Sequence, residues 1–363
     1  MKIHLRLSLL TLIVSLLFSH HTLANEPTTP QIHWQSVNQT IIDQHIIPRY
    51  LQMADSGAKL SQQAQRFCAA TDNESFEALR LAYHHAMDDW MGIQHIRFGP
   101  VELFLQYNRL QLWPDKHNTG SKQIRQVLSQ KPHDILDAER FALSSVAIQG
   151  FTALERLLYP STPHPNAFGG AGQPTYRCEL LMAITRNIAD IATNVHRDWR
   201  GGKVGFRDVV LSADHGNDYF DSSQEVSARL LSNLSTQLQS IVDQKLMLPL
   251  EHRKMELAES WRSRRSLRNI QLNLQALEDL YSTGFSGSVT DAKLDAEIRQ
   301  SFRDAITSLE AIHLPLYRIQ ANTEADQKLQ HVLESCRRLK RLINNQLPPT
   351  IGMTLGFNSL DGD

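Results

Sequence analysis

Three residues in the stretch IQGFTALERLLYP, residues 148–160, have a spacing that could serve chemistry. Gly150, Thr152 and Glu155 follow the pattern G-x-T-x-x-E in a segment whose apolar spacing predicts a helix. Residues three apart lie on one helix face, so Thr152 and Glu155 should point to the same place. Threonine is a poor metal ligand and a poor general base, whereas histidine serves as both. The stretch therefore predicts a polar binding pocket or a structural hydrogen-bond network, and no catalytic residue.

A second candidate is the stretch AYHHAMDDWMGIQHIRFGP, residues 82–100, in which histidines and aspartates stand one helical turn apart. Such pairs can share a metal ion, but ion pairing is the commoner use of this spacing. Helical zinc peptidases normally combine two histidines one turn apart with a carboxylate base, and the chain has no such set. We therefore predict no metal site and no cofactor. A metallopeptidase that draws unusual ligands from the region His84–His95 is the alternative.

Two basic stretches, WRSRRSLRNI (residues 261–270) and CRRLKRLINN (residues 336–345), follow further along the chain. Arg264 and Arg268 share a helix face and could engage an anionic ligand or Glu155. We expect the other arginines and the lysine of these stretches to lie on solvent-exposed helix surface.

Charge and composition exclude some classes of function. The 363 residues carry 37 basic and 38 acidic side chains, so no overall field favours nucleic acid or an anionic surface. No glycine-rich nucleotide motif or nucleophile elbow is present. The length allows one large domain or two ordinary ones.

The N-terminus has the pattern of a signal peptide. Lys2 and Arg6 precede an apolar segment at residues 7–18, and the small residues that follow predict cleavage after Ala24. We expect residues 1–24 to be removed and the mature protein to be periplasmic, associated with a membrane at most peripherally. An oxidising compartment permits a disulfide. Among Cys68, Cys178 and Cys336 the first two are expected at helix ends, which favours a Cys68–Cys178 bridge.

Helical periodicity runs through most of the mature chain, and few windows alternate as a strand requires. The fold class is therefore predicted to be all-α, with two packed helical bundles at residues 25–160 and 177–363 joined by a proline- and glycine-rich linker at residues 161–176. The expected helices span residues 38–67, 71–97, 134–160, 177–199, 222–246, 256–282, 291–313 and 323–346.

Several segments together resemble the imelysin-like family of exported bacterial proteins. In chain order these are RFGP, WPDKHN, GFTALERLLY, YRCELL, WRSRRSL and LGFNSLDGD, and they extend over nearly all of the mature chain. The family is named for an insulin-cleaving membrane protease and is linked to iron uptake. Its hallmark is G-x-H-x-x-E, and here Thr152 stands at the histidine position.

The resemblance implies two helical bundles with the motif near their interface. It places a ligand site at Gly150, Thr152 and Glu155, with Trp90, Arg97 and Arg265 nearby. Because Thr152 removes support for catalysis, we expect a non-catalytic accessory protein that binds a ligand in iron or metal uptake and works with a cell-envelope component. The other interpretations are the metallopeptidase above and a helical scaffold that docks on a membrane receptor.

Overall fold

The computed structural model describes residues 32–115, 117–160, 165–170, 173–201, 205–319 and 322–355. The predicted signal peptide, part of the predicted linker and the last eight residues of the chain lie outside this part. Almost all the regular structure is helical, with one pair of two-residue antiparallel strands, β1 (Gly169–Gly170) and β2 (Gln173–Pro174). The all-α fold class is confirmed. None of the helices in the described ranges is both long and apolar enough to cross a membrane.

The first predicted helix is longer than expected and contains a π-helical turn. Helix α1 (Trp34–Ile41), the π turn Ile42–Ile46 and helix α2 (Ile47–Ala70) follow one another directly. Pro48 lies just after the π turn inside this continuous helical run, so its missing N–H falls where the α-helical hydrogen-bond pattern is already interrupted. Helix α3 (Asn73–Ile93) then begins at Asp72, whose side chain accepts a hydrogen bond from the Ser75 N–H.

The predicted long helix at residues 134–160 is wrong. Only short helices form there: 3₁₀ turns at His133–Leu136 and Val146–Ile148, helix α6 (Ala138–Ala142) and helix α7 (Gly150–Leu158). The side chains of Asp137 and Ser145 accept hydrogen bonds from backbone N–H groups just after them, which starts new turns within the segment.

Gly150 explains why α7 begins where it does. Its φ is +69°, and a Cβ at this position would overlap the carbonyl groups of Arg109 and Leu110, at the end of helix α4 (Gln106–Leu110). A side chain there would be both strained and obstructed. The glycine of the motif therefore serves the close approach of α7 to α4.

Of the other helices in the described ranges, five correspond to predicted helices and five form where none is predicted. They are α5 (Thr119–Gln130), α8 (Tyr176–Arg200), α9 (Phe206–Leu211), α10 (Ser223–Gln239), α11 (Leu248–Glu251), α12 (Ser266–Leu280), α13 (Ala292–Glu310), α14 (Leu316–Ile319), α15 (Thr323–Arg341) and α16 (Leu347–Thr350). The predicted helices are α8, α10, α12, α13 and α15. Helix α12 begins ten residues later than the predicted 256, because the segment before it forms an irregular turn.

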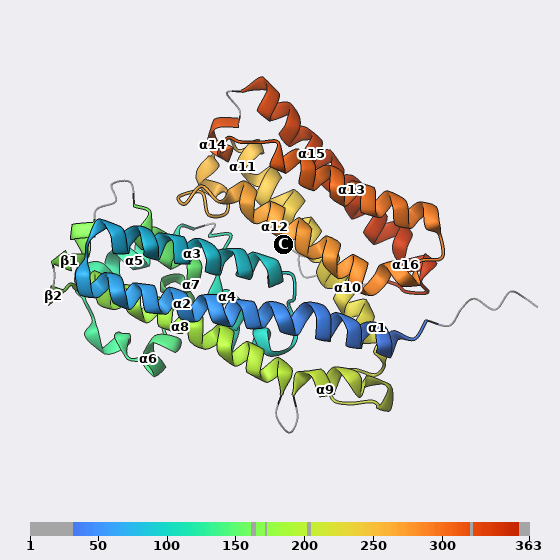
Figure 1. Ribbon diagram of the computed structural model, residues 1–363, viewed down its shortest axis with the longest axis horizontal. Coiled ribbons are helices and arrows are strands. Elements are labelled where there is room, and N and C mark those ends of the chain that lie inside the picture. The colour runs from blue at the N-terminus through green and yellow to red at the C-terminus, as the bar shows by residue number, and fades with distance from the viewer. Residues whose placement is uncertain are drawn as a thin grey trace, which may run out of the picture. The chain divides into compact units, whose positions relative to one another are not determined.

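Helix packing brings together segments that lie far apart in the chain. Helix α8 packs against α2 and α7. Helix α12 contacts α3 on one side and α13 on the other, and α13 lies along α15, as Figure 1 shows. The described residues from His33 onward group as one compact unit. The chain segment just before α12 is therefore brought against the helices around α7.

A disulfide joins Cys68 near the end of α2 to Cys178 near the start of α8, with their Cα atoms 5.7 Å apart. Cys336 is buried and free. Each bridged cysteine lies in the terminal turn of its helix, which is the arrangement expected from the sequence.

Candidate functional site

Glu155 is almost completely buried, with 3% of its surface exposed, and its partner comes from a distant part of the chain. Its Oε1 accepts hydrogen bonds from the backbone N–H of Ser263, at 2.8 Å, and from the Ser263 hydroxyl, at 2.6 Å. Burial raises the pKa of Glu155, and the two hydrogen bonds from Ser263 oppose that rise. The carboxylate is thus held by neutral donors alone.

The turn at residues 258–265 presents Ser263 to Glu155. Ser260 and Arg264 both adopt left-handed backbone conformations, with φ of 50° and 59°. The Arg265 N–H donates to the Ser260 carbonyl at 3.0 Å and closes the turn. Two non-glycine residues with positive φ in one short turn mark a local conformation that surrounding structure must enforce.

Glu155 and Thr152 line a cavity of about 510 Å³ between α7 and the segment before α12. Thr152 is half-buried and lies one helical turn before Glu155. The other lining residues are Gln111, Trp113, Pro114, Asp115, Asn118, Arg156, Leu248, Glu256, Leu257, Ala258, Ser260, Trp261 and Arg262. The volume is sufficient for a small molecule, and the wall mixes aromatic and charged side chains.

An ion pair closes one side of the cavity. Arg156 Nη2 donates to Asp115 Oδ2 at 2.8 Å, and about a tenth of each side chain is exposed. Asp115 also accepts from the N–H groups of Thr119 and Gly120, at the start of α5. The charge of Arg156 is therefore compensated. Arg262, on the opposite wall, has no ion pair among the described residues.

Trp90 does not line the cavity but is linked to it through Gln111. The Trp90 Nε1–H donates to Gln111 Oε1 at 2.7 Å, and Gln111 Nε2 donates to Glu259 at 3.2 Å. Arg97 lies further away in the same polar region. Its guanidinium donates to Gln237 at 3.3 Å and lies over the Tyr107 ring.

Arg265 follows Ser263 closely in sequence, yet its side chain is directed to α3. Its guanidinium donates to Asp88 and, at 3.0 Å, to His84 Nδ1. Because a guanidinium only donates, Nε2 of His84 carries the ring proton and donates to the Tyr159 oxygen, 2.9 Å away. Burial, with the Arg265 charge adding to it, lowers the pKa of His84 to about 4. Arg265 thus holds a neutral histidine and does not contact Glu155.

The chain is similar to known proteins in its sequence and in its fold. The family model of imelysin matches residues 46–344 of the chain. The chain belongs to the imelysin family.

Individual imelysin relatives are distant in sequence. A curated relative, iron-regulated protein A of Synechococcus elongatus, is 23% identical over 269 residues, which are 72% of this chain and 69% of the relative. The crystal structure of an imelysin-like protein from Psychrobacter arcticum superposes with a TM-score of 0.70 at 19% identity, covering 89% of this chain and 97% of that one. A structure described as an iron-regulated protein A precursor from Parabacteroides distasonis gives a TM-score of 0.74 at 15% identity, covering 88% and 95%. These two structures share the fold.

The residues present in this imelysin do not suit a metal ion at the motif. Thr152 offers a weakly coordinating hydroxyl, and Glu155 Oε1 is already engaged by Ser263. The alternative ligands are dispersed, because His84 binds Arg265 while the buried His95 pairs with His45, their Nε2 atoms 2.8 Å apart. Within the described ranges no group of three or more His, Cys, Asp or Glu side chains is arranged to hold a metal.

Sequence reasoning missed the residues that complete the cavity. Trp261 and Arg262 belong to the segment WRSRRSL, and Trp113 and Asp115 belong to WPDKHN. Ser263, which holds Glu155, also belongs to WRSRRSL. Both segments are among the family markers, so the sequence does single them out. It does not show that the fold places these two segments next to the motif.

Proposed function

We propose that this protein is a non-catalytic binding protein that serves iron or metal uptake, with the Glu155 cavity as its binding site. The observation that carries this proposal is a buried carboxylate held only by Ser263, facing a cavity that also contains the Arg262 guanidinium. Such a cavity offers Glu155 as an acceptor and Arg262 as a cationic donor. A metal chelate with acidic groups and bound hydroxyl or water protons would satisfy both.

The comparisons and the sequence support the physiological part of the proposal. A curated relative carries the name iron-regulated protein A, and the N-terminal residues have the pattern of a signal peptide. We infer that the mature protein acts in the periplasm beside an iron- or metal-uptake component of the cell envelope. The absence of an imidazole at residue 152 favours binding over peptide hydrolysis.

Calorimetry and thermal unfolding of the purified mature chain test the proposal. Ferric citrate should bind and raise the melting temperature, and Arg262→Gln and the cavity-filling Thr152→Trp should both remove that effect. Arg303→Gln, at an exposed site on α13, is the matched control. Cleavage of an insulin chain by the parent protein that disappears in Glu155→Gln would refute a non-catalytic role.

A further inference from the structure

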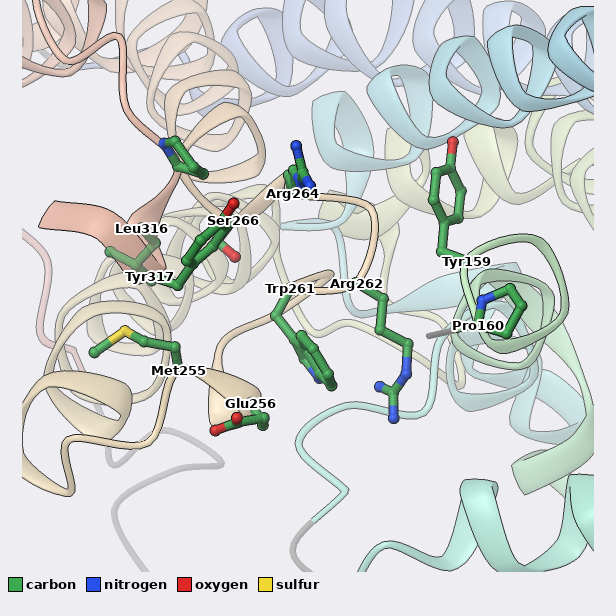
Figure 2. A pocket seen from close by; sticks show the side chains of 11 residues that line it. Tyr159, Pro160, Met255, Glu256, Trp261, Arg262, Arg264, Ser266, Leu316 and Tyr317 are labelled. Carbon is green, nitrogen blue, oxygen red and sulfur yellow. The ribbon is translucent and has the colours of Figure 1, made fainter. Parts of the chain in front are cut away.

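A second cavity lies against the turn that carries Ser263. Its volume is about 540 Å³, and Figure 2 shows its wall. The lining comes from the end of α7, from residues 255–266 and from the chain at α14. These residues are Tyr159, Pro160, Met255, Glu256, Trp261, Arg262, Arg264, Ser266, Pro315, Leu316 and Tyr317.

Two guanidinium groups of this cavity form no ion pair among the described residues, although the charge of Arg262 acts on the buried carboxylate of Glu155. Arg262 lies over the Trp261 ring, 4.4 Å from its centroid, and Arg264 lies 5.8 Å from the centroid of Tyr317. The nearby carboxylate of Asp88 is engaged by Arg265 and by Arg268. Glu256 is the acidic residue on the wall, so the two arginines leave the lining with a net positive charge.

The turn sets the backbone conformation from which these side chains extend. Arg264 has a positive φ of 59°, a conformation that costs energy in a residue with a side chain and that is concentrated at functional sites. Its N–H donates to the Trp261 carbonyl at 3.2 Å, and the neighbouring Ser263 is anchored on Glu155. In Figure 2 Trp261 and Arg262 extend to one side of the turn, while Arg264 extends to the other.

We propose that this second cavity binds a small planar aromatic anion, such as an aromatic carboxylate. Each arginine here lies beside an aromatic face, and that combination favours a ligand with a flat ring and a negative group. The ring would stack on Trp261 or Tyr317, and the carboxylate would accept paired hydrogen bonds from a guanidinium. An aliphatic anion would lose the stacking, and a neutral aromatic compound would lose the charge-assisted hydrogen bonds.

This site is distinct from the Glu155 cavity, although Glu256, Trp261 and Arg262 contribute to both walls. Arg264, Tyr159 and Tyr317 line only the second cavity, and Thr152 lines only the first. Variants at Arg264 and at Thr152 therefore separate the two proposals. The binding of an aromatic carboxylate does not depend on the proposed role in metal uptake.

Isothermal titration of the mature chain with 2-hydroxybenzoate tests this inference, with benzyl alcohol and cyclohexanecarboxylate as matched compounds. We expect saturable binding of 2-hydroxybenzoate, at least about tenfold weaker binding of both matched compounds, and a loss of about tenfold or more in Arg264→Gln. Tyr317→Leu, at a half-exposed ring, should also weaken binding, whereas Arg303→Gln should leave it unchanged. Thr152→Trp, at a residue that lines only the Glu155 cavity, should weaken binding less than Arg264→Gln does.

Several outcomes would overturn the inference. They are no binding at millimolar concentration, equal affinity for benzyl alcohol, or an Arg264→Gln variant that binds as well as Arg303→Gln. Loss of binding in a folded Thr152→Trp variant would place the ligand in the Glu155 cavity instead. Thermal unfolding of each variant establishes that it is folded before it is compared.

Discussion

Glu155 and Glu259 are buried to nearly the same degree, with 3% and 1% of their surfaces exposed, but their partners differ in charge. Glu259 Oε2 accepts from the Lys245 ammonium at 2.8 Å and from Asn269 at 3.0 Å. Glu155 accepts only from the backbone and hydroxyl of Ser263. One carboxylate is hydrogen-bonded to a cation inside the protein, and the other is hydrogen-bonded to neutral groups, with the charges of Arg262 and Arg156 acting on it from further away.

The surroundings of Lys245 complete this contrast. Its ammonium also donates to Gln94 at 2.9 Å and to Asn273 at 2.6 Å, so all three of its protons have oxygen acceptors. Burial lowers the pKa of Lys245, and the charge of Glu259 opposes that shift. A closed network of this kind joins the segment after α3 to α12 and leaves nothing for a ligand. Glu155 faces a cavity and has no hydrogen bond to a cation among the described residues, so it is open to a ligand.

The largest effect is expected from breaking the closed network. Replacing Lys245 by methionine leaves the Glu259 carboxylate buried without a counter-charge, which should lower the free energy of unfolding by about 3–5 kcal/mol. The double variant Lys245→Met/Glu259→Leu removes both charges and should cost less than the sum of the single variants. Urea unfolding followed by circular dichroism measures these values. A single variant that costs less than about 1 kcal/mol would remove the distinction between the two carboxylates.

Truncating Glu155 should have a smaller effect, because its partners are neutral. Glu155→Ala leaves the N–H and O–H of Ser263 unsatisfied, at a cost of about 1–3 kcal/mol. Glu155→Gln keeps an oxygen acceptor for Ser263 and should be milder. The same unfolding measurement compares the two variants. If glutamine proves as costly as alanine, the charge of Glu155 must be compensated within the protein after all.

Features that depend on neighbouring residues in the sequence could be predicted, whereas features that depend on contacts between distant segments could not. The helices at residues 177–199 and 222–246 follow from apolar periodicity, and the position of the disulfide follows from helix ends. The break-up of residues 134–160 could not be read from periodicity, because Gly150 is fixed by contact with the distant α4. Tertiary contact there overrode the local helical pattern.

The candidate site shows the same limit. Thr152 and Glu155 share a cavity because their i, i+3 spacing is a local property of a helix. The resemblance predicts Arg265 near the Glu155 site, and its guanidinium is bound to Asp88, since two left-handed residues turn the chain between Ser260 and Arg265. Backbone conformations of that kind in serine and arginine have no reliable sequence signal.

A third prediction uses pH to examine the charge of Glu155. The pKa of Glu155 in the folded protein is raised above the usual value of 4.5. At a pH between the unfolded and the folded pKa, Glu155 therefore holds a proton in the folded protein and loses it in the unfolded chain. Stability from this group is therefore full at lower pH and is lost as the pH rises through the folded pKa. The loss amounts to about 1.4 kcal/mol for every pH unit that separates the folded pKa from the unfolded one. The parent protein should lose more stability than Glu155→Gln when the pH rises from 4.5 to 7. Parallel curves for the two proteins would show that Glu155 titrates as it does in the unfolded chain.

The smallest intrinsic effect is expected from restoring the family histidine. Thr152 is half-buried on the wall of a 510 Å³ cavity, so Thr152→His should change stability by less than about 0.5 kcal/mol without metal. The new imidazole would lie one helical turn from Glu155 and give zinc a nitrogen and an oxygen ligand. Zinc at about 100 times its dissociation constant should then stabilise the variant by about 2.7 kcal/mol. Thr152→Gln, which is of similar length but lacks the ring nitrogen, should show no such gain, and Glu155→Gln in the histidine background should weaken it. If zinc stabilised the parent protein to the same extent, Glu155 would bind a metal without the histidine. Glu155 would then differ from Glu259 in being a metal ligand, whereas Glu259 belongs to an ion pair.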